Sequence, residues 1–216
     1  MVNKEMTKIT FVINRLIIGG PQKVVVFLAN YLIKLGYDVS IISLSAVPPT
    51  LDIHKDVDLR FLGYEQHHVK SSVATARVLM KAKMIYRLRR VISTIEPSLI
   101  CAFMPGIVRL VLVATTGLSY PVIGSERGNP YIFSRRKLKQ YESAYRKCSA
   151  VVFQTEKSAE AFSDAVRNKS VVIPNPCTPR VKPIEPHDGD RRKIIVGAGR
   201  LEPEKGFDNL IRSFEK

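Results

Sequence analysis

Residues 8–44 read KITFVINRLIIGGPQKVVVFLANYLIKLGYDVSIISL and decide the fold. The β-branched run Lys8–Asn14 is typical of a strand, and Pro21 stands where proline favours the first turn of a helix. Gly36 can adopt the left-handed conformation that ends such a helix, and a second apolar strand follows over Asp38–Leu44. The stretch therefore predicts a strand, helix, strand unit. The predicted buried stripe of its helix is Val24, Val25, Leu28, Leu32 and Leu35.

The chain that follows alternates strands and helices in the same way. We predict strands over Asp58–Leu62, Leu99–Phe103, Pro121–Ser125, Ala150–Gln154 and Ser170–Ile173, and helices over Ser71–Ile95, from the fourth strand to about Leu118, over Ser134–Lys147 and over Thr155–Ala165. Such alternation is typical of a parallel sheet with helices on both faces. We therefore expect an α/β, Rossmann-like domain over residues 1–176.

Residues 177–192 predict a linker. Five prolines stand between Pro174 and Pro186, with few apolar residues among them. Because proline lacks a backbone N–H, such a stretch does not continue a sheet or a helix, and we expect it to run over the surface.

Residues 193–216 predict the start of a second domain. An apolar strand over Lys193–Gly197 is followed by a turn and by a helix from Gly206. The apolar stripe of that helix, Leu210, Ile211 and Phe214, has almost no further chain to cover it. We therefore expect the second domain to be incomplete and the sequence to be a fragment.

The composition indicates an anionic partner. The net charge is +15 and the isoelectric point is near 9.9, which favours nucleic acid, a membrane surface or a phosphorylated ligand. The odd, widely spaced cysteines Cys101, Cys148 and Cys177 favour a reduced setting, with the first two buried. No signal peptide is predicted, and prolines and an arginine interrupt the longest apolar stretch, Leu99–Gly124, so that no membrane span is expected. None of the four histidines (His54, His67, His68 and His187) has metal-ligand spacing, so no metal site is expected.

Two loops carry residues suited to a phosphate group, since ligands of open parallel sheets bind beyond the carboxyl ends of the strands. Gly19 and Gly20 precede a helix, where free backbone N–H groups favour a phosphate, although two glycines also permit a simple tight turn. Arg200 and Lys205 precede the helix of the second domain. They are suited to neutralising a diphosphate that gains charge as it leaves, and solvated surface cations are the alternative interpretation.

Three motifs together resemble retaining glycosyltransferases of family four. They are the glycine pair before the first helix, IPNP at residues 173–176 and GRLEPEKGFDNLI at residues 199–211. The resemblance implies the GT-B arrangement, in which two Rossmann-like domains face a cleft. FMPG and SERGNP, within residues 102–130, further resemble the bacterial branch that adds sugars to lipid-linked oligosaccharides during polysaccharide or glycan assembly.

The resemblance implies a role for each matching residue. Gly19 and Gly20 would lie near the diphosphate of a nucleotide-sugar donor, expected to be UDP-linked, while Arg200 and Lys205 would bind it and stabilise the leaving nucleotide without a metal or other cofactor. Glu126 and Arg127 would face the acceptor; the alternative is that they pair with each other or cap the next segment.

Two departures from the family pattern limit this implication. Many relatives read GGAE at the first loop, where this chain has GGPQ at residues 19–22, so a carboxylate is replaced by an amide. The family's pair of donor-binding glutamates belongs to the later part of the second domain. We therefore expect negligible transferase activity from these 216 residues alone.

Basic helix faces predict a membrane contact. Lys83, Arg87 and Arg90 recur at helical spacing and can lie against anionic lipid, which predicts a peripheral protein at the inner face of the plasma membrane. The apolar residues opposite them are Val78, Ile85, Leu88 and Ile92. Solubilising faces are the plainer alternative. Two other classes stay open: a nucleic-acid-binding protein, for which only the charge argues, and a non-catalytic Rossmann module that binds a membrane or a partner.

Overall fold

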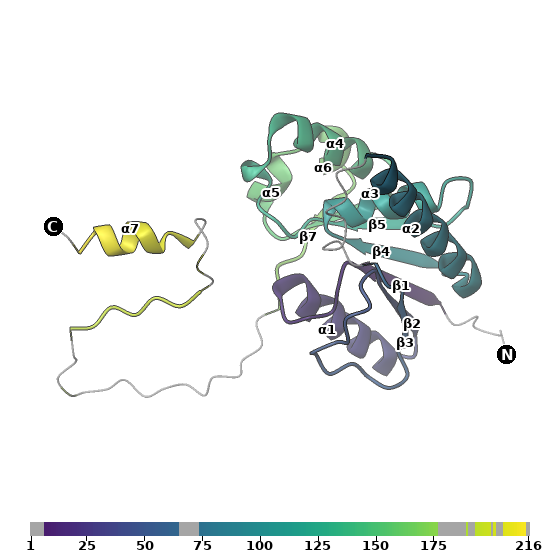
Figure 1. Cartoon of the computed structure of the whole chain (residues 1–216), viewed down its shortest axis with the longest axis horizontal. Coiled ribbons are helices and arrows are strands. Elements are labelled where there is room, and N and C mark those ends of the chain that lie inside the picture. The colour runs from purple at the N-terminus through teal and green to yellow at the C-terminus, as the bar shows by residue number, and fades with distance from the viewer. Residues whose placement is uncertain are drawn as a thin grey trace. The chain divides into compact units, whose positions relative to one another are not determined.

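The computed structural model describes residues 7–64, 74–176, 189, 193–199, 201 and 205–214. The chain divides into two compact units, Met1–Pro176 and Cys177–Lys216. Figure 1 shows that nearly all the regular structure lies in the first unit, with one helix, α7, in the second.

The first unit is built on a seven-stranded sheet with the order β3-β2-β1-β4-β5-β6-β7. Its strands are β1 (Lys8–Ile13), β2 (Asp38–Ser43), β3 (Asp58–Phe61), β4 (Leu99–Phe103), β5 (Val122–Ser125), β6 (Ala150–Phe153) and β7 (Ser170–Val172). All neighbouring strands pair in parallel. The α/β, Rossmann-like fold expected from the sequence is confirmed.

Helices cover both faces of this sheet (Figure 1). They are α1 (Gly20–Lys34), α2 (Ala74–Ile95), α3 (Pro105–Ala114), the short 3-10 helix η2 (Pro130–Ile132), α4 (Arg135–Tyr145), α5 (Glu156–Glu160) and α6 (Asp164–Arg167). Successive strand residues point to opposite faces, so Phe11 and Ile13 of β1 pack in the cluster beside α1, while Val12 packs in the cluster beneath α2, α3 and α4. The hydrophobic core therefore has two halves, one on each side of the sheet.

The helix predicted over residues 155–165 is divided into α5 and α6. Phe162 lies between them and is buried against Tyr145 and Phe153, with ring centroids 5.3 and 5.2 Å away. The chain turns there because burying this ring in an aromatic cluster outweighs one more turn of helix. The helix after β4 also ends early, at Ala114, and Gly117 adopts a φ of 77° just beyond it.

One residue that was predicted to be buried is exposed, and so is one apolar residue predicted to lie opposite the basic residues of α2. Leu35 is the C-cap residue at which α1 ends, and its side chain is 55% exposed. Val78 is 69% exposed. Among the α2 residues whose side chains are described, the first buried one is Met84, so Val78 lies before the part of the helix that packs on the sheet.

The two cysteines predicted to be buried lie in the first unit. Cys148 is buried after α4, and Cys101 of β4 packs partly buried against the core. Burial raises the pKa of the Cys101 thiol to about 12 and that of Cys148 to about 11. Both groups are therefore neutral thiols at physiological pH.

In the second unit, the prediction of a strand over Lys193–Gly197 is wrong, within the part of the chain that the structure describes. These residues form no ladder with any described segment, and a strand exists only with a hydrogen-bonded neighbour. The ring of Phe207 instead lies against the glycine backbone, since a Cβ added to Gly197 would stand 2.8 Å from it.

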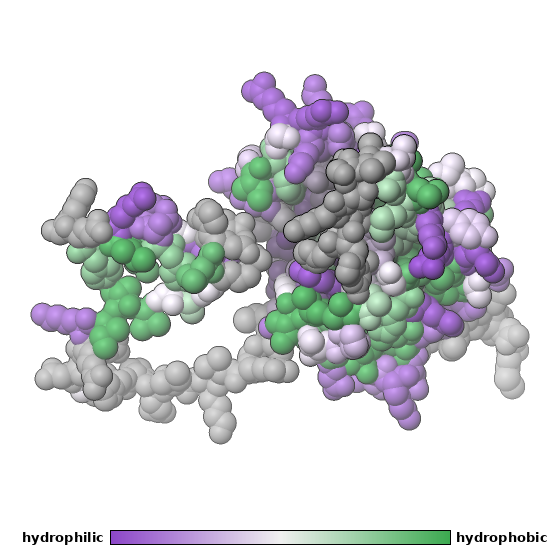
Figure 2. Space-filling view, in the orientation of Figure 1, coloured by the Kyte–Doolittle hydropathy of each residue, from purple (hydrophilic) through white to green (hydrophobic). Residues whose placement is uncertain are grey.

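Helix α7 (Phe207–Arg212) starts after Gly206, whose φ is 66°. The predicted exposure of its apolar stripe is confirmed, because Ile211 and Phe214 are exposed. Figure 2 shows the resulting apolar surface on the second unit.

We predict that Gly124→Ala destabilises the first unit. A Cβ on Gly124 in β5 would stand 3.0 Å from a ring carbon of Tyr145 and 3.2 Å from the Cys148 sulfur, and both neighbours are buried. Overpacking of this kind lowers the free energy of unfolding by about 1–3 kcal/mol, which urea denaturation followed by circular dichroism measures.

Gly106→Ala is the matched control, because a Cβ there meets no atom within 4 Å and the residue is helical. We expect its free energy of unfolding to stay the same or to rise by up to about 1 kcal/mol. Equal stability of Gly124→Ala and the wild type would contradict the packing of Tyr145 against β5.

Candidate functional site

The carboxyl ends of the strands gather the loops that carry the predicted site residues of the first unit. Because every strand pair is parallel, the loops after β1, β4, β5 and β6 all leave the sheet at one edge. The order of strands reverses direction between β1 and β4, where ligands of such sheets bind. Gly19 and Gly20 on the first of these loops, and Glu126 and Arg127 on the third, therefore lie along the same edge.

The space beside Gly20 is open. A Cβ added to Gly20 meets no atom within 4 Å, and its φ lies outside the left-handed region, so neither packing nor backbone conformation requires glycine there. Gly19 is extended, with a φ of −179°, and no side chain caps α1. A ligand that approaches the backbone closely is one physical reason for a glycine at a position with no internal constraint.

Glu126 lies inside the molecule, with 1% of its surface exposed. Its Oε1 accepts a hydrogen bond from the Gly128 N–H at 2.8 Å, and its Oε2 accepts one from the Tyr145 hydroxyl at 2.9 Å. Desolvation by burial raises the pKa of this carboxyl group, and the hydrogen bonds oppose that rise only in part. Glu126 thus ties the loop after β5 to α4.

Arg127 joins three segments at the carboxyl edge. Its Nε donates to the Ser125 hydroxyl at 2.7 Å and its Nη1 to the Asn175 side chain at 2.9 Å. Its guanidinium group also lies 5.2 Å from the centroid of the Phe103 ring. No ion pair joins Arg127 to Glu126, although both residues are described. Burial lowers the pKa of Arg127.

Arg127 also lines an open groove of about 800 Å³. The other residues of this groove are Gly128, Asn129, Tyr131, Gln154, Thr155, Lys157 and Ser158. No acidic side chain is among them, so the groove offers two cations, Arg127 and Lys157, to an anionic group. The sequence analysis did not single out Gln154 or Lys157, although their position directly after β6 was a signal for them.

The predicted residues of the second unit are only partly described. Lys205 is exposed and its side-chain stem lies beside Gly199. Arg200 lies outside the described residues. The structure therefore places Lys205 at the turn before α7, as the sequence predicts.

The basic residues predicted on α2 share one groove. Lys83, Arg87 and Arg90 line a hollow of about 720 Å³ beside β3, together with the exposed rings of Phe61 and Tyr86. None of the helices that the structure describes is long and apolar enough to cross a bilayer.

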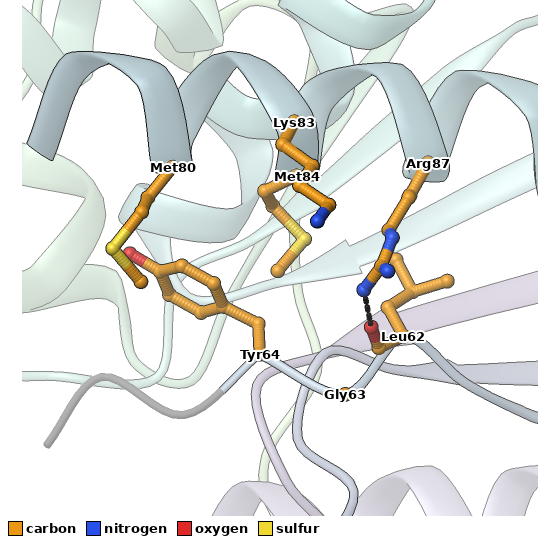
Figure 3. A pocket seen from close by; sticks show the side chains of 7 residues that line it. All are labelled: Leu62, Gly63, Tyr64, Met80, Lys83, Met84 and Arg87. Carbon is orange, nitrogen blue, oxygen red and sulfur yellow. Dashed lines mark hydrogen bonds between the residues drawn. The ribbon is translucent and has the colours of Figure 1, made fainter. Parts of the chain in front are cut away.

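A smaller pocket of about 300 Å³ adjoins this groove and is drawn in Figure 3. There Met80, Lys83 and Arg87 reach from α2 toward the chain after β3. Arg87 donates from Nη1 to the Leu62 carbonyl at 3.1 Å, so this cation also holds α2 on the end of β3.

We predict that Glu126→Gln alters the pH dependence of stability. The pKa of Glu126 in the folded state lies above the ordinary value of 4.5. The neutral form of its carboxyl group therefore contributes stability that is fully present below pH 4.5. This contribution is lost as the pH rises through the folded-state pKa. The free energy of unfolding of Glu126→Gln should therefore rise relative to the wild type from about pH 4.5 upward, by at most about 1.4 kcal/mol per pH unit.

Urea denaturation between pH 4 and 8 measures this difference, and Glu160→Gln controls for the loss of an exposed carboxylate. A difference between Glu126→Gln and the wild type that does not change with pH would contradict the buried, pKa-raised state of Glu126.

Comparison with known proteins assigns the chain to a family. Residues 18–180 match the family model described as Glycosyltransferase Family 4. No curated protein matches the sequence.

Solved glycosyltransferase structures share the fold. The lipopolysaccharide outer core galactosyltransferase WaaB has a TM-score of 0.64 and 13% identity, over 86% of this chain and 50% of WaaB. Sucrose-phosphate synthase from Thermosynechococcus elongatus has a TM-score of 0.59 and 10% identity, over 78% of this chain and 48% of that one. HepE from Anabaena, solved with UDP-glucose, has a TM-score of 0.58 and 14% identity, over 78% of this chain and 43% of HepE.

The chain spans about half the length of these structures or less. Its parallel sheet with helices on both faces matches the fold of the N-terminal Rossmann-like domain of GT-B glycosyltransferases. With a family model that matches most of its residues, the chain belongs to Glycosyltransferase Family 4.

Proposed function

We propose that the full-length protein containing this chain transfers a sugar from a UDP-linked donor to a lipid-linked saccharide acceptor in bacterial polysaccharide or glycan assembly. The family match over residues 18–180 carries the proposal. The open space beside Gly20, at the carboxyl edge of the sheet, supports a donor diphosphate there.

In the proposed reaction, the bond between the sugar C1 and the diphosphate oxygen breaks. The acceptor hydroxyl oxygen bonds to C1 on the face that the nucleotide leaves, so the configuration at C1 is retained, and the hydroxyl proton passes to the departing diphosphate oxygen. Arg200 and Lys205 offset the charge that develops on UDP, which is the charge that a metal ion would otherwise neutralise. Arg127 and Lys157, in their groove without acidic side chains, suit an anionic group on the saccharide part of the acceptor.

The proposed site of action is the inner face of the plasma membrane. Lys83, Arg87 and Arg90 bring three positive charges to one groove, beside the exposed rings of Phe61 and Tyr86. Each cation near an anionic lipid surface contributes about 1 kcal/mol, and aromatic rings favour the interfacial region. This combination supports peripheral attachment through α2.

We predict that Arg200→Ala and Lys205→Ala each lower sugar transfer by the full-length protein about 100-fold or more, since each removes a cation from the leaving diphosphate. The assay incubates the protein with radiolabelled UDP-sugars and bacterial lipid extract, and counts label in the organic phase. Lys193→Ala, at an exposed lysine of the same unit, is the control and should stay within about twofold of the wild type. Absence of label transfer by the wild type, or full activity of both variants, would overturn the proposed function.

We predict that the double variant Lys83→Gln, Arg90→Gln binds anionic vesicles about 2 kcal/mol more weakly than the wild type, or roughly thirtyfold. Arg87 is kept because it holds the Leu62 carbonyl. Co-sedimentation with phosphatidylglycerol-containing vesicles measures the affinity. The control Lys34→Gln, Lys55→Gln has the same net charge and removes exposed lysines that line neither α2 pocket. Equally strong binding of the wild type to neutral phosphatidylcholine vesicles would contradict the electrostatic attachment.

A further inference from the structure

A pocket of about 510 Å³ lies among α2, α3 and α4, and its lining includes residues that follow β1, β2, β3 and β4. None of the predicted site residues lines it. Its lining is mostly apolar, and the aromatic and methionine residues in it are Tyr64, Met84, Met104, Phe133 and Tyr141. A volume of this size is within the roughly 300–1,000 Å³ of small-molecule sites.

Its aromatic wall is fixed by local packing. The rings of Phe133 and Tyr141 meet edge to face, with centroids 5.1 Å apart and an angle of 78°. Phe133 is held where η2 ends and α4 begins, and the Ser134 hydroxyl accepts from the Lys137 N–H to cap α4. The wall is therefore formed before any ligand arrives.

The floor of the pocket includes a residue in an uncommon backbone conformation. Met104 has a φ of 77° and a ψ of 141°, and its N–H donates to the Ser125 carbonyl at 2.9 Å. Non-glycine residues with positive φ are uncommon and cluster at binding sites. Here the conformation places Met104 between the end of β4 and the start of α3, where it lines the pocket.

Two cations also line the pocket, and none of its lining residues is acidic. Lys81 comes from α2 and Arg109 from α3, and the Arg109 Nη1 donates to Gln140 Oε1 at 3.0 Å. Arg109 also lines an adjoining groove of about 490 Å³ with three further cations, Arg136, Lys139 and Lys147. Figure 2 shows hydrophilic residues gathered around α4.

From this juxtaposition we infer that the pocket binds a phosphorylated amphiphile. The first units of its hydrocarbon chain lie against the aromatic and methionine side chains, and Lys81 and Arg109 bind its phosphate groups. The inference rests on the proposed function, because it assigns to the lipid-linked acceptor a site in the first unit. It goes further in naming where that acceptor's lipid and phosphate lie.

The test is isothermal titration calorimetry of the 216-residue chain with monomeric farnesyl diphosphate. Farnesol, which lacks the phosphates, and inorganic diphosphate, which lacks the chain, are the matched probes. We expect binding of farnesyl diphosphate at least about tenfold tighter than either. Lysophosphatidic acid, the second amphiphile, identifies the source: tighter binding of farnesyl diphosphate points to an isoprenoid acceptor, and tighter binding of lysophosphatidic acid to a membrane phospholipid.

Three variants locate the binding. Gly106→Leu adds a side chain to the pocket lining at a position where a Cβ meets no atom within 4 Å, so it should block the pocket while the chain stays folded. Arg109→Gln should weaken farnesyl diphosphate binding about tenfold. Arg136→Gln, at a cation that lines only the adjoining groove, is the control and should change the affinity less than about twofold.

Unchanged affinity in both Gly106→Leu and Arg109→Gln would overturn the inference, as would an equal loss in Arg136→Gln and Arg109→Gln. Circular dichroism of each variant verifies the fold. Label transfer to lipid by the full-length protein tests the proposed function by itself. The calorimetry needs no turnover, so each idea can fail without the other.

Discussion

Parallel pairing of all seven strands is the constraint on which this molecule depends. Each strand must return by a crossover, so helices cover both faces and the strands are apolar on both sides. Most charged residues then lie in loops, on the outer faces of helices, at strand ends and on the edge strand β3. The same constraint places the carboxyl ends of all seven strands at one side of the sheet. The net charge of the chain is +15, and cationic side chains line grooves beside these carboxyl ends and along α2 and α4.

The buried carboxyl group of Glu126 shows how this edge is kept in order. Placing an acid in an apolar interior is costly, and the raised pKa reflects that cost. Its two hydrogen bonds connect the loop after β5 to α4, while Arg127 connects the same loop to β4 and to the chain after β7. One dipeptide thus fixes the relative positions of four segments, which keeps the groove beside Arg127 shaped without a ligand.

The sequence predicted the elements whose signal is local. Leu99–Phe103 is a strand both in the prediction and in the structure, because a short apolar run bounded by Pro97 and Pro105 can be recognised without its neighbours in space. The break between α5 and α6 could not be predicted, since it depends on the meeting of Phe162 with rings distant in sequence. The strand over 193–197 failed for a related reason: its apolar residues are local, but a ladder requires a partner.

The candidate site was less predictable than the fold. Glu126 and Arg127 were predicted because they follow a strand. The sequence does not reveal that Glu126 is buried, or that Arg127 contacts three segments. The pocket beside Phe133 and Tyr141 was not predicted, although the FMPG motif contributes Met104, Pro105 and Gly106 to its lining. Its other walls come from helices that meet only in three dimensions. The amphipathic pattern of each helix predicts that one face packs on the core. It does not predict a pocket that three helices form together.

The thiols of Cys101 and Cys148 allow the opening of this domain to be followed at two places. Burial raises the pKa values of Cys101 and Cys148 to about 12 and about 11, so neither supplies the reactive thiolate at neutral pH while the fold is closed. One lies on the central strand β4 and the other beside α4, near β5 and β6. The alkylation rate of Cys101 therefore reports the opening of the centre of the sheet, and the alkylation rate of Cys148 reports the release of α4.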